Sequence, residues 1–136
     1  MDADSDLAGR LAEHPEIVFA HLFGSRGTGG ARPDSDWDIA VYLRDDLTAR
    51  ERFDIRRHLA AELEDLGEVD VVVLNDAPPL LGHRALMGRR LVVKDPTVLV
   101  RYSVRTLARS EDERYWRDLQ WKARRQRLED GTFGRR

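Results

Sequence analysis

Asp36 and Asp38 stand two positions apart in residues 36–43, a segment with the pattern of a β-strand. Successive side chains of a strand alternate between the two faces of a sheet, so both carboxylates lie on one face. The alternate face receives the apolar side chains of Ile39, Val41 and Leu43. Two like charges this close repel, and one takes up a proton unless a cation joins them. The segment therefore predicts a strand whose polar face serves a ligand.

A hard divalent cation removes this repulsion, and Mg²⁺ prefers one or two carboxylates together with substrate phosphates and waters. A third acid, Asp70, interrupts residues 69–74, an otherwise continuous apolar run typical of a buried strand. A charged side chain there is costly unless it is paired or bound to metal. We therefore expect Asp70 to join Asp36 and Asp38. The chain has no cysteine, so any metal must be held by oxygen or imidazole.

A glycine-rich loop, residues 24–30, follows a β-branched and aromatic segment, residues 17–23, that predicts the first strand. Glycine lets the backbone approach a ligand closely, and turned loop amides cradle phosphate. The Ser25 hydroxyl adds a donor, and the forked guanidinium of Arg26 suits phosphate. Gly24, Ser25 and Arg26 are thus candidate nucleotide-binding residues.

Each of these signals has a simpler interpretation when it is taken alone. A Gly-Ser pair is usually a turn, and Asp70 could cap a helix or pair with an arginine. Residues 34–38 could form a solvated turn or part of a calcium loop, although the glycine and glutamate of an EF-hand are not at their positions. Only the order and spacing of all the signals together are specific.

The remaining segments predict helices that alternate with strands. A helix is expected at residues 7–14, and Thr48 with Glu51 forms a capping box that opens a helix to about Leu66, closed by Gly67 in the left-handed conformation. Further expected elements are a helix from residues 78–79 through 87, a strand at 91–93, and a helix from 95–96 to about 128 that breaks near Ser110. This order predicts an α/β (α+β) fold, a small mixed sheet with helices packed on it. We assign residues 1–95 to the core and 96–136 to a C-terminal helical extension of the same domain.

Composition narrows the class of protein. The 136 residues suit one domain, and a net charge of −2 gives no global field that would draw the chain onto nucleic acid, so a nucleic-acid partner is unlikely. The N-terminus has no secretory signal pattern, and no apolar run approaches the ~18 residues of a membrane helix. We expect a cytoplasmic protein.

None of the four histidines has metal-ligand spacing, and Trp37 should face away from the metals.

Residues 114–127 mix aromatic and basic side chains and leave three interpretations open. Trp116 and Leu119 could pack on the sheet while the arginines are solvated. The segment could instead form a partner surface, since Trp and Arg are favoured at interface hot spots. Aromatics interleaved with arginine also suit stacked RNA.

Two separated motifs carry a resemblance to a known family. Residues 22–26 (Leu-Phe-Gly-Ser-Arg) and 33–41 (Pro-Asp-Ser-Asp-Trp-Asp-Ile-Ala-Val) resemble the signature of the polymerase-β-like nucleotidyltransferases. Within this superfamily the chain looks most like the minimal nucleotidyltransferases, small proteins often paired with a HEPN partner. The resemblance runs from about Ile17 to Val93.

The resemblance implies a role for each matching position. Asp36 and Asp38 would ligate two Mg²⁺ ions, Asp70 would complete the site for one of them, and Gly24 and Ser25 would hold the triphosphate. The reaction would transfer a nucleoside monophosphate and release pyrophosphate. One departure concerns Thr28, which stands where many relatives carry arginine. This departure would affect the rate of transfer more than the type of reaction. Arg26 or Arg32 could bind the phosphates in place of the missing arginine.

The HEPN-paired members further imply an antitoxin that acts as a protein adenylyltransferase. Its donor would be ATP, and its acceptor a tyrosine hydroxyl on a HEPN-family toxin. Two alternatives remain open: a binding module that masks its partner without catalysis, and a nucleotidyltransferase for aminoglycoside-like small molecules.

Overall fold

The computed structural model describes residues 2–28 and 36–129, without the side chains of Thr28 and of several residues after position 112. Its centre is a four-stranded sheet of order β3-β2-β1-β4. The strands are β1 (Ile17–Phe23), β2 (Trp37–Leu43), β3 (Val69–Val73) and β4 (Arg89–Val93). β1 runs antiparallel to both β2 and β4, and β2 runs parallel to β3. The predicted small mixed sheet is confirmed.

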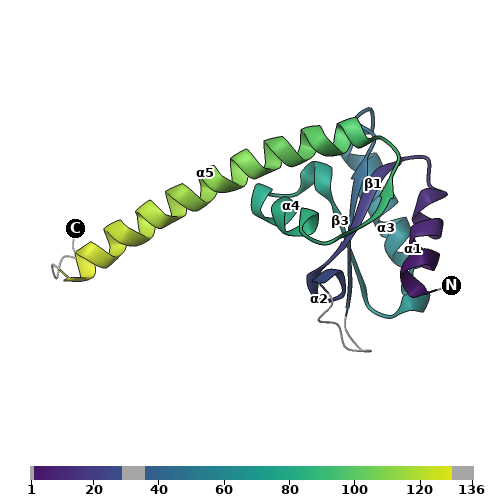
Figure 1. Cartoon of the computed structure of the whole chain (residues 1–136), viewed down its shortest axis with the longest axis horizontal. Coiled ribbons are helices and arrows are strands. Elements are labelled where there is room, and N and C mark those ends of the chain that lie inside the picture. Colours follow the sequence, from purple (N-terminus) through teal and green to yellow (C-terminus); the bar gives the residue numbers. More distant parts are fainter. Residues whose placement is uncertain (1, 29–35, 130–136) are drawn as a thin grey trace.

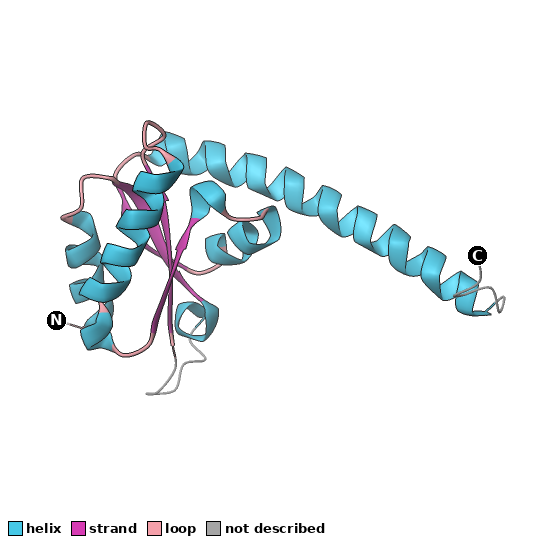
Figure 2. Cartoon of the chain, turned by 180° about the vertical axis from the view of Figure 1, so that it is seen from behind, coloured by secondary structure: helices cyan, strands magenta, loops and turns pink. Residues whose placement is uncertain are grey.

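Helices cover both faces of the sheet (Figures 1 and 2). Helices α1 (Ala3–Ala12) and α3 (Ala49–Glu62) pack on one face, where Leu7, Leu59 and Ile39 share one core. Helices α4 (Pro79–Leu86) and α5 (Pro96–Glu129) belong to the other face. The core there includes Phe19, Phe23, Tyr42, Leu74, Ala85, Leu99 and Tyr102. Because side chains alternate along β1 and β2, these strands contribute apolar residues to two separate cores, one on each face of the sheet.

The parallel pair β2–β3 needs a crossover, which α3 supplies. The predicted capping box is present, since the Glu51 N–H donates to Thr48 Oγ1 and the Thr48 N–H donates to Glu51 Oε1. The helix ends at Glu62, and a 3₁₀ turn, η1 (Glu64–Leu66), follows it. Gly67 has φ +121° and ψ −148°, which lies outside the left-handed helical region, so the predicted type of cap is wrong.

Two predicted helix boundaries also differ from the structure. α1 begins four residues early, at Ala3, because the Asp2 carboxylate accepts from the Ser5 N–H and caps it. α5 runs without the break predicted near Ser110. The Ser110 hydroxyl donates to the Leu107 carbonyl within the helix, so a serine that could compete with the backbone instead bonds along it.

The first turns of α5 lie against the rest of the molecule through buried Leu99, Tyr102, Thr106 and Ser110. Asp95 caps this helix by accepting from the Thr97 and Val98 N–H groups, with Pro96 at the first helical position as predicted. The rest of α5 extends away from the sheet (Figure 2). In the part of the chain described, no helix is long and apolar enough to cross a membrane.

Candidate functional site

Three carboxylates gather at one end of the sheet. Asp38 lies on β2 and pairs in register with Asp70 on the parallel strand β3. Asp36 directly precedes β2 and is exposed, as is Asp70, whereas Asp38 is half-buried. Burial raises the pKa of Asp38, and the negative charges of Asp70 and Asp36 raise it further. The fold thus brings the three predicted acids into one electrostatic cluster.

Asp70 reaches this cluster for a different reason than the sequence suggested. The apolar run around it predicted a strand buried on both faces, but β3 is an edge strand with Val71 and Val73 buried and Asp70 exposed. The prediction of a buried carboxylate is therefore wrong. Its position is fixed by strand register instead, because the parallel pairing sets it directly beside Asp38.

The three carboxylates suit a cation that takes most of its other ligands from waters and substrate phosphates. Among the described residues, no three histidine, aspartate or glutamate side chains form a group able to hold a metal ion. Magnesium usually takes one or two protein carboxylates and fills its shell with waters and substrate phosphates. Burial is the largest cause of the raised pKa of Asp38, and the negative charges of Asp70 and Asp36 add to it. A dication would relieve that repulsion.

Gly24 joins β1 to the site. Phe23, the last residue of β1, is the register partner of Asp38, and Gly24 follows it with φ +68°. A Cβ at Gly24 would overlap the Asp38 carboxylate. Glycine is thus required here twice, for the backbone conformation and for the close approach of the carboxylate.

The segment after β1 is a short helix, α2 (Gly24–Thr28), and not the predicted loop. The reason is tertiary packing around Gly27, which is buried so close to the Leu22 carbonyl that a Cβ would overlap it. Glycine is a poor helix former, but close packing overrides a weak propensity. The remaining loop residues 29–30 lie outside the described residues, as does Arg32.

Ser25 and Arg26 follow Gly24 within α2. Ser25 is exposed and directly follows Gly24 beside the carboxylates. The Arg26 guanidinium lies 4.1 Å from the centre of the Trp37 ring, and its backbone carbonyl accepts from Arg89. Trp37 is 4% exposed and belongs to the core on the face opposite Asp38, as predicted. The Arg26 guanidinium therefore contacts the Trp37 ring.

Two side chains near the site could not be found by sequence spacing. Arg84 on α4 is close enough for its positive charge to lower the pKa of Asp38, partly offsetting the acids. His21 on β1 is 2% exposed and meets Phe19 edge to face at 5.8 Å. Neither of its ring nitrogens has a hydrogen-bond partner of good geometry, and burial lowers its pKa. Arg84 comes near Asp38 because α4 packs on this side of the sheet, and His21 faces α4 because it lies on the same face of β1 as Phe19.

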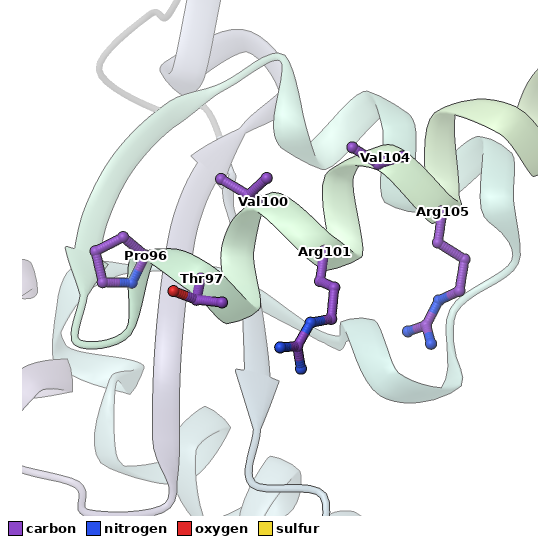
Figure 3. A pocket seen from close by; sticks show the side chains of 6 residues that line it. All are labelled: Pro96, Thr97, Val100, Arg101, Val104 and Arg105. Carbon is purple, nitrogen blue, oxygen red and sulfur yellow. The ribbon is translucent and has the colours of Figure 1, made fainter.

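A hollow of about 590 Å³ along the start of α5 is separate from this site (Figure 3). In the close view, Val100 and Val104 project from one side of the helix, and Arg101 and Arg105 from another. None of the described residues that line the hollow carries a carboxylate. Further along α5, Trp121 is 59% exposed, whereas the side chains of Trp116 and Leu119 lie outside those described.

A mixed sheet with three carboxylates at one end, beside Gly24 and Ser25 at the start of α2, defines a domain of the nucleotidyltransferase type. The family model "Polymerase beta, Nucleotidyltransferase" matches residues 6–97, and the chain belongs to this family. The resemblance of the two sequence motifs and the predicted fold class are thereby confirmed.

Similar proteins narrow the comparison. The chain is 33% identical over 78 residues to the protein adenylyltransferase MntA of Shewanella oneidensis, which covers 57% of this chain and 55% of MntA. The chain thus spans about half the length of this curated relative. A crystal structure of a toxin–antitoxin with AMP-PNP matches with a TM-score of 0.67 at 22% identity, over 90% of this chain and 98% of the other. A complex of tri-AMPylated Shewanella oneidensis HEPN toxin with its MNT antitoxin matches with a TM-score of 0.63, also at 22% identity, over 88% and 94%.

Proposed function

We propose that this protein transfers AMP from ATP to a hydroxyl group of a protein, and that it acts in this way as the antitoxin of a HEPN-type toxin. The observation that carries the proposal is the cluster of Asp36, Asp38 and Asp70 at the end of three adjacent strands. Support for a protein acceptor comes from the relative MntA, named a protein adenylyltransferase, and from the similar complex whose HEPN toxin is tri-AMPylated.

Each site residue has a role in this proposal. Asp36 and Asp38 would hold two Mg²⁺ ions, and Asp70 would complete the site of one. Bound ions of this kind neutralise the charge on the phosphates and on the attacking and leaving oxygens. Gly24 leaves room for the Asp38 carboxylate, and Ser25 contributes a donor to the triphosphate. Arg26 is a further candidate for the triphosphate, and its guanidinium lies over the Trp37 ring.

The proposed transfer is an in-line displacement at the α-phosphorus. The acceptor oxygen forms a bond to that phosphorus, and its proton passes to the Asp70 carboxylate. The bond from the α-phosphorus to the bridging oxygen breaks, and pyrophosphate leaves with the electron pair. The protein contributes positioning and charge more than covalent chemistry.

The test is intact-mass spectrometry of purified, unmodified Shewanella oneidensis HEPN toxin after incubation with this protein, ATP and Mg²⁺. We expect the toxin to gain the mass of one or more adenylates. The gain should vanish in the double variant Asp36→Asn, Asp38→Asn. It should persist in Asp46→Asn, which changes a carboxylate that is 72% exposed and follows the other end of β2. An unchanged toxin mass with the unsubstituted protein would contradict the proposal.

A second candidate function is masking of the partner without catalysis. It is favoured by the exposed apolar side chains on α5, since Val100 is 61% and Val104 66% exposed beside the hollow of Figure 3. Such patches commonly mark interaction surfaces. A stable complex with the toxin and no change in its mass would favour this function over transfer.

A further inference from the structure

The outer edge of β3 is open. Among the described strands, β3 pairs only with β2 and ends the sheet. An edge strand presents a row of unpaired backbone N–H and C=O groups, which form a template for another extended chain. Most proteins cover such an edge or make it unsuitable for pairing. An accessible edge next to a functional site is therefore a candidate binding site for another polypeptide segment.

A hollow of about 430 Å³ lies directly against this edge. Four consecutive residues of β3 line it, namely Asp70, Val71, Val72 and Val73. Side chains of a strand alternate between the two faces, so a hollow on one face would meet only every second residue. A hollow lined by all four must lie beside the backbone, between the two layers of helices.

The walls of this groove are partly apolar and partly cationic. Phe53 of α3 is 45% exposed, and the Arg56 guanidinium lies 5.7 Å from the centre of its ring. Arg52 donates to both oxygens of Asp76, at 2.9 and 2.8 Å, and so ties α3 to the turn that follows β3. The groove is therefore framed by a salt bridge and combines a backbone floor with side-chain walls. An extended polypeptide makes both kinds of contact, main-chain bonds along the floor and side chains in the walls.

One end of the groove is Asp70 itself. In the proposed function Asp70 takes the proton of the acceptor hydroxyl, so the acceptor must approach from its side. A strand rises about 3.3 Å per residue, so the four lining residues accommodate an extended segment of about four residues.

We propose that the acceptor polypeptide binds in this groove as an added strand on the edge of β3, with its hydroxyl-bearing residue at the Asp70 end. This proposal rests on the proposed function, because it takes the occupant to be the protein that receives AMP. It assigns the groove to recognition of the acceptor and leaves the triphosphate on the Gly24 side of the carboxylates.

The first test fills the groove. Ala49 and Ala61 are both exposed on α3, but only Ala49 lines the groove, whereas Ala61 lines a separate hollow near the end of the helix. We expect Ala49→Trp to raise the KM for the HEPN toxin about tenfold or more, which corresponds to about 1.4 kcal/mol of lost binding, and to leave the KM for ATP unchanged. Ala61→Trp should change neither. Unaltered transfer by a folded Ala49→Trp variant would overturn the groove proposal alone.

The second test reports on the strand without using the reaction. Amide hydrogen exchange is followed in residues 69–73 while Shewanella oneidensis HEPN toxin and a non-hydrolysable ATP analogue are added. We expect these amides to become protected only when the toxin is present. Protection confined to α5, or protection of β3 by a second copy of this chain without toxin, would overturn the proposal. If the unsubstituted protein transfers no adenylate to the toxin but the β3 amides still become protected, the proposed function is overturned. The groove then remains a binding site for the toxin.

Discussion

Gly24→Ala separates the stability of the fold from the geometry of the site. Gly24 has φ +68°, and an alanine forced into that region costs about 1–2 kcal/mol. Replacing glycine also restricts the unfolded chain, which returns about 0.4–1 kcal/mol. The overlap of the new Cβ with Asp38 falls on a carboxylate oxygen, the end of a short side chain that can rotate away. The net cost is therefore about 1 kcal/mol, a fall in Tm of about 3–5 °C for a chain of this size.

The expected effect of Gly24→Ala on activity is much larger than its effect on stability. The overlap is relieved by movement of the Asp38 carboxylate, one of the proposed metal ligands. Misplacing a catalytic group by about 1 Å can cost about a hundredfold in rate. We therefore expect kcat for adenylate transfer to fall about a hundredfold, while thermal unfolding remains cooperative and close to that of the unsubstituted protein.

Gly67→Ala is the matched control. Gly67 also has positive φ, +121°, but a Cβ there would have no neighbour within 4 Å. This variant should lose stability through backbone strain and keep its rate of transfer. Differential scanning calorimetry gives the first quantity, and initial rates of toxin modification give the second. The reasoning is refuted if Gly24→Ala keeps the full rate, or if Gly67→Ala loses activity to the same extent.

Three further variants test the electrostatics and the packing. Asp38→Asn removes the charge that the neighbouring carboxylates repel, so the urea midpoint of the metal-free protein should rise while adenylate transfer is lost. Burial lowers the pKa of His21 in the folded state. Below about pH 6.5 the imidazole therefore takes up a proton only in the unfolded chain. The free energy of unfolding then falls by up to ~1.4 kcal/mol per pH unit until the folded-state pKa is reached. His21→Phe should reduce this loss in urea unfolding followed from neutral to acidic pH. Asn75→Ala removes a side chain that accepts from the Leu43 N–H at 2.9 Å and donates to its carbonyl at 2.8 Å, and thermal unfolding should show a loss of about 1–3 kcal/mol.

Each of these variants has an outcome that contradicts its premise. A lower urea midpoint for Asp38→Asn would mean that the carboxylate makes a net favourable contact in the metal-free protein. An unchanged acid sensitivity in His21→Phe would assign that sensitivity to other groups. A full loss of transfer in Asn75→Ala, with its fold intact, would mean that the end of β2 acts on the site at its other end.

The parts of the fold that follow from local chemistry could be predicted from the sequence. β1 has the predicted bounds, residues 17–23, because its β-branched and aromatic residues are bounded by a proline and a glycine. The capping box at Thr48 and the Asp95–Pro96 start of α5 are also as predicted, since caps depend on residues within one turn. Asp38 lies on the face of β2 that the strand period predicts, opposite Trp37 and Ile39, whereas Asp36 stands one residue before the strand.

The differences from prediction arise where distant segments decide the structure. The apolar run around Asp70 is compatible with a central or an edge strand, and only the order of the whole sheet places β3 at its edge. Gly24–Thr28 becomes a helix because Gly27 packs on the backbone of Leu22, a contact between elements. α5 runs unbroken through Ser110, whose hydroxyl donates to the Leu107 carbonyl, a choice of partner that the sequence alone does not indicate.

The site itself illustrates the same division. Spacing along the chain could pair Asp36 with Asp38, but it could not order Phe23, Asp38 and Asp70 side by side on three strands. That order requires one antiparallel and one parallel neighbour for β2, which together align the end of β1, the start of β2 and the start of β3. The same arrangement leaves the far edge of β3 open beside Asp70. The mixed sheet therefore sets both the spacing of the carboxylates and the side from which an acceptor can reach them.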